Sequence, residues 1–193
     1  MMNRIILASA SPRRHQLLQW AEVPYDVLVK ETDEMYPAHL PVPEVPVYIA
    51  RNKALAVQQE LSHERVILAA DTVVVLDDRI IGKPRNRDEA IETLQQLSGR
   101  IHQVITGVVL LRGDESLTFS DTTFVHFHPL TYDQIVYYVD HYRPYDKAGA
   151  YAIQEWIGVV GIKRVEGDFY NVMGLPVSRV VQALQQLGLG NSQ

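Results

Sequence analysis

Apolar and polar positions alternate in blocks along this chain, and the blocks follow the order typical of an α/β protein. Short apolar runs predict strands, and helical spacing of apolar positions predicts helices between them. Strands are expected at Ile5–Ala8, Tyr25–Val29, Val66–Leu76, Ile80–Ile81, Ile101–Leu111 and Leu117–Phe127, followed by a late hairpin of Val159–Val165 and Phe169–Val172. The run Val66–Leu76 is apolar on both faces, which indicates a central strand.

Capping residues, prolines and glycines mark where the helices begin and end. Asn86 with Glu89, and Thr131 with Gln134, have the spacing of a capping box. Helices are expected over Pro12–Trp20 and Val47–Leu61, after Asn86 as far as Gly99, after Thr131 as far as Pro144, and from Pro176 to Leu187. The proline-spaced segment Pro37–Pro46 is predicted to be a loop that hinges two lobes.

Composition excludes several classes of protein. The chain has 193 residues, enough for one sizeable core, and 23 acidic against 18 basic residues give a net charge of −5. Broad binding of DNA or RNA needs an extended positive face, so no nucleic-acid partner is expected. Cysteine is absent, which excludes disulfides, thiolate catalysis and zinc–sulfur sites and favours a reducing compartment. No apolar run has the length of a signal peptide or a membrane span, so a cytoplasmic protein without a membrane partner is expected.

The sharpest candidate site lies at the start of the first helix. Ser11 stands at the N-cap and Pro12 at the first helical position, with Arg13 and Arg14 following in the first turn. A helix N-terminus already carries positive partial charge, so two cations there are unfavourable unless an anion lies between them. Backbone N–H groups, the Ser9 and Ser11 hydroxyls and two guanidinium groups suit a phosphate. The alternative is a pair of solvated arginines on a surface helix.

Two charged residues stand where the apolar pattern predicts aliphatic side chains. Asp71 interrupts Val66–Leu76, and an ionised carboxylate there is costly unless a cation, hydrogen-bond donors or a metal pairs with it. Thr72 adds a hydroxyl that points to the opposite face of an extended strand. Lys53 falls within the apolar arc of Val47–Leu61. The alternatives are an aspartate that bonds backbone N–H groups at a strand end and a lysine that snorkels to solvent.

Two later segments carry weaker signals. In Gly82–Pro84 a permissive glycine and a rigid proline would aim Lys83 at a defined point, although the same residues form ordinary turns. The segment Tyr145–Gln154 contains Lys147 and small residues around Gly149 that allow a ligand to approach the backbone. Its Gln154 amide offers a donor and an acceptor, which suits the edge of a nucleobase. An ordinary loop leading into a strand is the alternative.

An acidic cluster of Glu31, Asp33 and Glu34 follows the second predicted strand. Carboxylate oxygens are the ligands that a magnesium-type ion prefers, so this cluster could hold such an ion together with Asp71. Taken singly, acidic clusters are usually solvated, and the sequence does not select among the three residues.

Taken in order, these motifs resemble the Maf family of nucleoside triphosphate pyrophosphatases. The resemblance rests on Ser9–Arg14, Ala70–Thr72, Gly82–Pro84, Asp146–Tyr151 and Met173–Pro176, and it extends from about Ile5 to Leu187. It implies an inosine-triphosphatase-like fold, with helices flanking a long bent mixed sheet. It further implies one domain over residues 1–193 whose two lobes have a nucleotide cleft between them, and a homodimer.

The resemblance implies metal-assisted hydrolysis between the α- and β-phosphates, which yields a nucleoside monophosphate and pyrophosphate. Glu34 and Asp71 would hold Mg²⁺ or Mn²⁺, with Glu31 and Asp33 as fallback ligands, and Asp71 would accept the proton of the attacking water. The cations expected to neutralise the triphosphate are Arg13, Arg14, Lys53, Lys83 and Lys147, and Ser9 and Ser11 would add hydroxyl bonds to phosphate.

Three positions sort the chain within the family. Arg13, Thr72 and Gln154 match the dTTP/UTP subgroup, whereas members of the 7-methyl-GTP subgroup have tryptophan, glutamine and glutamate there. A neutral amide suits a pyrimidine edge, which offers carbonyl acceptors and an N–H donor. The chain departs from many members in having Glu155, where they have glycine, so a bulkier base loop is expected.

Two other functions stay open on the sequence. A nucleotide-sensing regulator of cell division could use the same phosphate-binding residues without hydrolysis. His126 and His128 share one face of a predicted strand and would suit a metalloenzyme, but no third ligand is evident nearby. Sequence does not rank dTTP, UTP, CTP and modified pyrimidines, nor does it choose between nucleotide-pool cleaning and cell division arrest as the physiological role.

Overall fold

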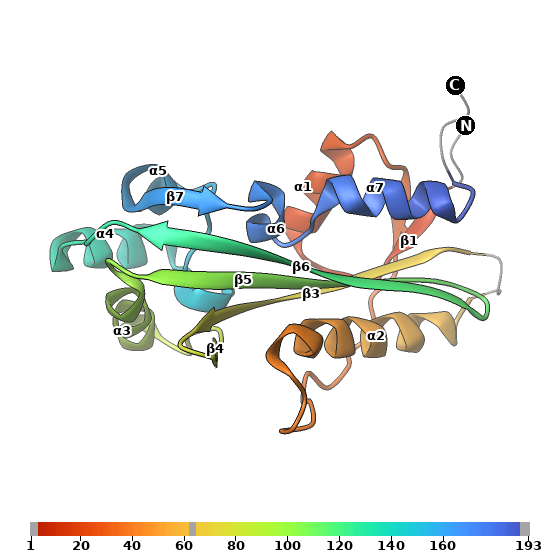
Figure 1. Ribbon diagram of the computed structural model, residues 1–193, viewed down its shortest axis with the longest axis horizontal. Helices are drawn as coiled ribbons and strands as arrows, with labels where there is room; N and C mark the ends of the chain where they lie inside the picture. Colours follow the sequence, from red (N-terminus) through yellow and green to blue (C-terminus); the bar gives the residue numbers. More distant parts are fainter. Residues whose placement is uncertain (1–3, 62–64, 190–193) are drawn as a thin grey trace. The chain divides into compact units, whose positions relative to one another are not determined.

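The computed structural model describes residues 4–61 and 65–189 and has the mixed α/β architecture that the pattern predicts (Figure 1). Within these ranges a seven-stranded sheet has the order β2-β1-β3-β5-β6-β7, with β4 paired to β3 outside this path. The strands are β1 (Ile5–Leu7), β2 (Tyr25–Val27), β3 (Ile67–Leu76), β4 (Arg79–Ile81), β5 (Ile101–Arg112), β6 (Glu115–Phe127) and β7 (Ile162–Glu166). β1 runs parallel to β2 and β3, whereas β4 and β7 are antiparallel to their neighbours, so the sheet is mixed.

Helices flank the sheet on both faces (Figure 1). They are α1 (Pro12–Trp20), α2 (Val45–Gln58), α3 (Arg87–Leu97), α4 (Tyr132–Tyr142), α5 (Trp156–Gly161), α6 (Phe169–Met173) and α7 (Val177–Gln186), with short 3₁₀ helices η1 (Val42–Glu44) and η2 (Ala148–Ala150). Contacts divide the chain into two compact units. The first unit comprises Met1–Asp71, Thr106–Asp121 and Gly174–Gln193, and the second comprises Thr72–Ile105 and Thr122–Met173.

In the first unit, α2 covers one face of the strands, and α1 and α7 lie on the other (Figure 1). Ala50, Ala54 and Val57 on the inner face of α2 pack against Ile67 and Ala69 of β3 in one apolar cluster. Burying an aliphatic side chain of the size of valine or isoleucine contributes about 1.5–3 kcal/mol, which explains why the apolar arc fixes the orientation of α2.

In the second unit, α3 packs against α4 and η2. Both predicted capping residues are confirmed: Asn86 Oδ1 accepts from the Glu89 N–H at 3.0 Å, and Thr131 forms a reciprocal capping box with Gln134. α4 ends at Tyr142, ahead of Pro144, as the proline predicts.

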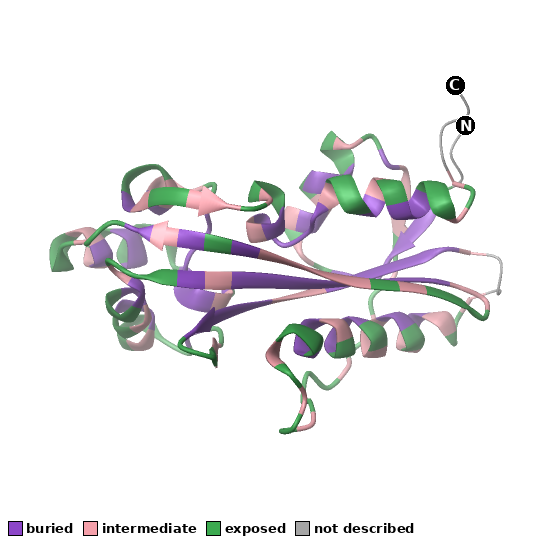
Figure 2. Ribbon diagram, in the orientation of Figure 1, coloured by how far each residue is buried: buried purple, intermediate pink, exposed green. Residues whose placement is uncertain are grey.

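The central position predicted for β3 is confirmed, because β1, β4 and β5 all neighbour it. Figure 2 shows β3 buried over most of its length. The two partly exposed positions in it are Asp71 and Thr72. The polar residues that interrupt the apolar run therefore stand where solvent and small molecules can reach the strand.

The late hairpin predicted for this chain is wrong. Val159 lies in α5, and the segment Phe169–Val172 lies in α6 instead of forming a return strand. β7 pairs instead with β6. The physical reason lies in the connection, where Asp168 Oδ1 accepts from the Tyr170 N–H at 2.7 Å, a local bond that starts a helical turn.

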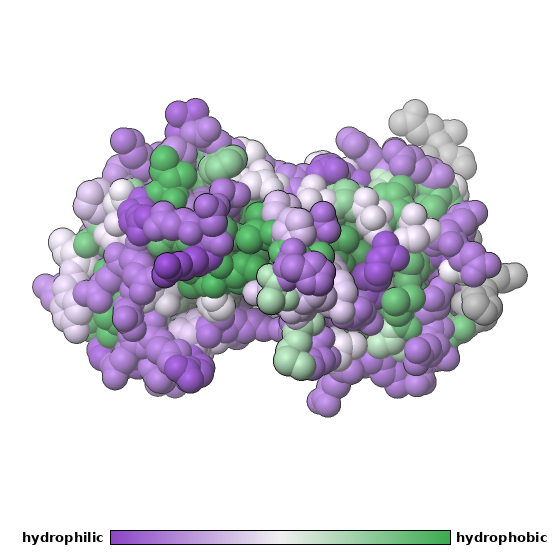
Figure 3. All heavy atoms as spheres, turned by 60° about the horizontal axis from the view of Figure 1, so that its bottom comes forward, coloured by the Kyte–Doolittle hydropathy of each residue, from purple (hydrophilic) through white to green (hydrophobic). Residues whose placement is uncertain are grey.

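Several boundaries also differ from expectation. α2 begins at Val45, inside the predicted loop Pro37–Pro46, because Pro46 occupies a first-turn position that needs no N–H donor. α2 ends at Gln58, and β2 ends at Val27. None of the described helices is long and apolar enough to cross a membrane, and hydrophilic side chains cover most of the face drawn in Figure 3.

Candidate active site

Ser11 stands at the N-cap of α1 as predicted, but the hydroxyl that bonds to this turn is that of Ser9. Ser11 occupies the N-cap position, but its side chain makes no capping bond. Instead, Ser9 Oγ accepts from the Ser11 N–H at 3.2 Å and from Arg14 Nη1 at 3.1 Å. Ser9 and Arg14 are both buried, so the first turn carries a guanidinium fixed by a neighbouring hydroxyl.

Arg14 is a cation buried among partners of both signs. Its Nε donates to the Gly174 carbonyl at 2.8 Å. Burial lowers the pKa of Arg14 below its ordinary value, Asp71 and Glu34 raise it, and Arg13 lowers it further. A guanidinium keeps its proton in proteins, so Arg14 is a permanent charge that acts on both carboxylates. Arg13 lies one position earlier on α1 and is partly exposed.

Lys53 connects the two carboxylates that the resemblance assigns to the metal. Its Nζ lies 2.7 Å from Asp71 Oδ1 and 2.7 Å from Glu34 Oε1. The side chains of Lys53 and Asp71 are 19% and 15% exposed, against 52% for Glu34. The carboxylate of Asp71 in the central strand is therefore paired with a cation. A cation was one of the three kinds of partner expected for it, beside hydrogen-bond donors and a metal.

The acidic cluster separates into residues with different roles. Glu34 contacts Lys53, whereas Asp33 Oδ1 accepts from the Met35 N–H at 2.9 Å in a local turn, and Glu31 is exposed. In the described ranges, no group of three His, Asp or Glu side chains could hold a metal ion. Two carboxylate oxygens that meet at one cation suit a hard divalent ion, which would take its other ligands from water or a bound phosphate.

In the second unit, two predicted motifs meet at η2. The Gly149 N–H donates to the Gly82 carbonyl at 3.2 Å, which joins the Lys83 segment to the Lys147 segment. Gly149 has φ +71°, and a Cβ there would lie 3.0 Å from the side chain of Val74. The glycine thus permits a close approach, here by a side chain of β3. Lys83 is exposed.

Lys147 is engaged with carboxylates of its own loop. It is buried, and its Nζ lies 2.8 Å from Asp146 Oδ1 and 3.7 Å from Glu155 Oε1. Sequence reasoning missed both partners. Glu155 was noted in the sequence because it departs from the family pattern. Its contact with Lys147 could not be predicted from the spacing of the two residues.

Gln154 is exposed, whereas the residues around it are held by α4. The Tyr138 hydroxyl accepts from the Ala152 N–H at 3.1 Å and donates to Glu155 Oε2. Gln154 lines a cavity of about 410 Å³ together with Gly158, Lys163 and Phe169, among others. The carboxylate of Glu155 is therefore bonded within the protein, while Gln154 lines the cavity.

The two histidines considered as metal ligands have separate surroundings. His126 Nε2 lies 2.8 Å from Glu166 Oε1, across the pairing of β6 with β7. β6 ends at Phe127, so His128 lies beyond the strand and the predicted shared strand face is wrong.

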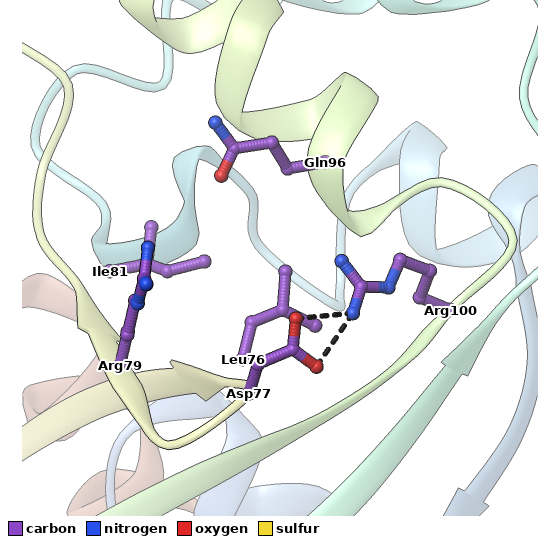
Figure 4. Close-up of a pocket in the computed structure, with 6 residues that line it drawn as sticks. All are labelled: Leu76, Asp77, Arg79, Ile81, Gln96 and Arg100. Atoms are coloured by element: carbon purple, nitrogen blue, oxygen red, sulfur yellow. Dashed lines mark hydrogen bonds and ion pairs between the residues drawn. The ribbon is translucent and has the colours of Figure 1, made fainter.

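Another cavity in the second unit, of about 420 Å³, contains none of the predicted site residues (Figure 4). Leu76 and Ile81 contribute apolar surface, and Arg79, Gln96 and Arg100 contribute polar groups. Arg100 Nη2 donates to Asp77 Oδ1 at 2.6 Å. This pairing neutralises the charge of Arg100 within the protein.

A comparison with known protein families identifies the family of this chain. The sequence model described as Maf-like protein matches residues 4–187. The chain belongs to the Maf-like protein family. The resemblance carried by the motifs is therefore confirmed over nearly the whole chain.

Curated relatives of this Maf-like protein share close to half of its residues. A dTTP/UTP pyrophosphatase of Cytophaga hutchinsonii is 46% identical over 183 residues, which cover 95% of this chain and 84% of that protein. A dTTP/UTP pyrophosphatase of Porphyromonas gingivalis is 46% identical over 191 residues, covering 97% of this chain and 96% of the relative. The similarity spans both units.

Solved structures support the predicted fold. A Ham1 protein from Staphylococcus aureus aligns with a TM-score of 0.53 at 16% identity, and a HAM1 protein from Coxiella burnetii with 0.51 at 15% identity. Each alignment covers 96% of this chain and 100% of the other. The inosine-triphosphatase-like fold expected for a Maf-like protein, with a mixed sheet flanked by helices, is confirmed.

Proposed function

We propose that this Maf-like protein hydrolyses dTTP and UTP between the α- and β-phosphates, releasing pyrophosphate and dTMP or UMP. The observation that carries the proposal is the position of Lys53 Nζ, 2.7 Å from both Asp71 and Glu34. Such a cluster suits the attack of water on the α-phosphorus, which needs cations beside the developing charge and a carboxylate that accepts a proton. Relatives named dTTP/UTP pyrophosphatase support the choice of substrate.

The cations have distinct tasks in this mechanism. Arg14 and Lys53 of the first unit stabilise the negative charge that develops on the departing pyrophosphate. Ser9 holds Arg14 in place through its hydroxyl, at 3.1 Å. Lys83 is exposed two residues after the end of β4 and neutralises a further phosphate. Lys147 contributes less charge than the sequence suggests, because Asp146 already pairs with it.

Asp71 accepts the proton of the attacking water. The water oxygen forms a bond to the α-phosphorus, the bond from the α-phosphorus to the bridging oxygen breaks, and the bridging oxygen leaves with pyrophosphate. Asp71 is suited to this role because it is partly exposed in a strand that is otherwise buried, and Lys53 orients its carboxylate.

Glu34 and Asp71 would hold the divalent cation, Mg²⁺ or Mn²⁺, since their oxygens meet at one point and are the donors that these ions prefer. The ion would supply Lewis-acid polarisation of a phosphoryl oxygen. Lys53 occupies the position between the two carboxylates and would shift toward the phosphates when an ion binds.

Gln154 is the residue assigned to the base. Gln154 is exposed and lines a cavity, and its amide can donate to a pyrimidine carbonyl and accept from the ring N–H. Arg13 and Thr72, the other positions that match the dTTP/UTP subgroup, are both partly exposed.

A panel of nucleotides tests this function. With Mg²⁺ or Mn²⁺ present, purified protein should release pyrophosphate from dTTP and UTP faster than from dATP or 7-methyl-GTP. Equal or reversed rates would refute the specificity. Binding of dTTP without pyrophosphate release would favour the rival function, a nucleotide sensor. We further propose that the protein is a homodimer, which light scattering at micromolar concentration tests. We also propose that it is cytoplasmic and forms one functional domain.

A further inference from the structure

A buried tyrosine hydroxyl contacts the chain on both sides of Gln154. Tyr138 lies on α4 and is fully buried. Its hydroxyl accepts from the Ala152 N–H at 3.1 Å and donates to the Glu155 carboxylate. Ala152 stands two residues before Gln154 and Glu155 one residue after it. One oxygen atom therefore holds both ends of the short segment that carries the amide.

Glu155 continues this connection to Lys147. Its Oε2 accepts from Tyr138, and its Oε1 lies 3.7 Å from Lys147 Nζ. A carboxylate with a different partner on each oxygen has a fixed orientation. Burial and the hydrogen bond to Glu155 raise the pKa of Tyr138, so its hydroxyl keeps the proton that it donates.

α5 restricts the same segment as well. A Cβ at Gly158 would lie 1.7 Å from the Ile153 carbonyl oxygen, so the helix packs directly on the backbone. The ring of Trp156 lies 4.9 Å from that of Tyr137 on α4. The backbone around Gln154 is thus held firmly, while its side chain is exposed.

We propose that Tyr138 and Glu155 are positioning residues for base recognition. Their contact fixes the place of the Gln154 amide and thereby sets the discrimination between pyrimidines and other bases. Neither residue touches the substrate. The inference rests on the proposed function, since that function assigns the base to Gln154. It explains the presence of a glutamate at position 155, because a glycine there could not reach Tyr138.

The variant Tyr138→Phe tests the hydroxyl while keeping the ring. Losing a hydrogen bond that orients a binding group should raise KM for dTTP and UTP about tenfold. The kcat at saturation should change less than about twofold, because the residues that act on the phosphates are not altered. Tyr142→Phe is the matched control, since Tyr142 lies on the same helix and stacks on Tyr138 at 4.9 Å.

The Glu155 variants separate a positioning role from simple loss of packing. Glu155→Gln keeps an oxygen that accepts from Tyr138, so KM should stay close to that of the unaltered protein. Glu155→Ala should also raise KM for dTTP and UTP, and the double variant should lose less than the sum of the two single losses in free energy, because both variants remove the contact between Tyr138 and Glu155. Additive effects, or an equal loss for every nucleotide tested, would overturn the proposal.

A binding measurement keeps the two proposals distinguishable. The chain has two tryptophans, so Trp20→Phe leaves Trp156 as the reporter beside Glu155. Trp156 fluorescence is titrated with the α,β-imido analogue of dUTP and with tripolyphosphate, both with Mg²⁺. Tyr138→Phe should weaken binding of the analogue and leave tripolyphosphate binding unchanged.

The outcomes differ for each proposal. If the unaltered protein binds the analogue but releases no pyrophosphate from dTTP, only the proposal of hydrolysis is overturned. The titration still tests the positioning role of Tyr138 and Glu155. A folded Tyr138→Phe variant, checked by circular dichroism, that binds the analogue with full affinity overturns the positioning role alone. Equal affinity of the unaltered protein for the analogue and tripolyphosphate overturns base reading and positioning together.

Discussion

Lys53 Nζ lies 2.7 Å from Asp71 Oδ1, and this ion pair joins α2 to the middle of β3 in the first unit. Both side chains are less than one-fifth exposed, at 19% and 15%. Removing one partner of such a pair leaves the other charge poorly solvated, which costs more than breaking an ion pair at the surface. The pair therefore links the chemistry of the site to the stability of its surroundings.

Asp71→Asn should abolish most of the turnover while the protein stays folded. An amide cannot accept the proton of water, and a general base typically contributes about 10²- to 10⁴-fold to a rate. Pyrophosphate release from dTTP measures the loss, with circular dichroism as the check on folding. Asp140→Asn is the control, because Asp140 forms an exposed ion pair with Arg87. A folded Asp71→Asn variant with nearly full turnover would remove Asp71 from the mechanism.

Lys53→Met should lower turnover and strengthen binding of Mn²⁺ in the absence of nucleotide. The ammonium occupies the position between Asp71 and Glu34, so it competes with a divalent ion for the same oxygens. Electron paramagnetic resonance of free Mn²⁺ measures the affinity. Lys30→Met, which breaks an exposed pair with Glu60, should leave it unchanged. Mn²⁺ binding no tighter than in the unaltered protein would contradict competition by Lys53.

His102 should make the protein less stable in acid. It is buried on β5 with Nε2 2.7 Å from the Tyr151 hydroxyl. Burial, and to a lesser extent His126, lowers its pKa from 6.5 to about 4. Between these values the unfolded chain binds the proton and the folded protein does not, so the stabilisation is complete above pH 6.5 and is lost as the pH falls toward 4. The loss is about 3 kcal/mol.

Urea unfolding at pH 7 and pH 4.5 measures this dependence. His102→Gln should flatten it, because a neutral amide does not titrate. His141→Gln, at an exposed position of α4, should leave the dependence unchanged. An unaltered slope in His102→Gln would assign the acid sensitivity to other groups.

Gly158→Ala should displace the segment that carries Gln154. The added Cβ would lie 1.7 Å from the Ile153 carbonyl oxygen, and backbone cannot yield as a flexible side chain does. We expect a loss of stability of about 1–3 kcal/mol and a larger rise in KM for dTTP than in the inhibition constant of tripolyphosphate. Val160→Ala on the same helix is the control. Unchanged stability and KM would show that the segment adapts without cost.

Local structure in this protein was predictable because its causes lie within a few residues. The side-chain caps at Asn86 and Thr131 depend on donors three residues away, and both predictions are confirmed. The central strand was recognisable from an apolar run, and Asp71 and Thr72 stood out because they break it. The strand predicted at Phe169–Val172 was wrong. The bond from the Tyr170 N–H to Asp168 Oδ1 starts a helical turn there, against the apolar pattern.

The sequence by itself therefore determined the family, the fold class and the set of chemically unusual residues. Only the tertiary structure decided which of them touch. Lys53 and Asp71 are 18 residues apart in the chain, and Tyr138 and Glu155 are 17 apart. Such pairs form when separate segments of the chain pack together through buried apolar faces, and the local sequence pattern does not predict them. The carboxylate that contacts Lys53 and the partner of Glu155 follow from that docking.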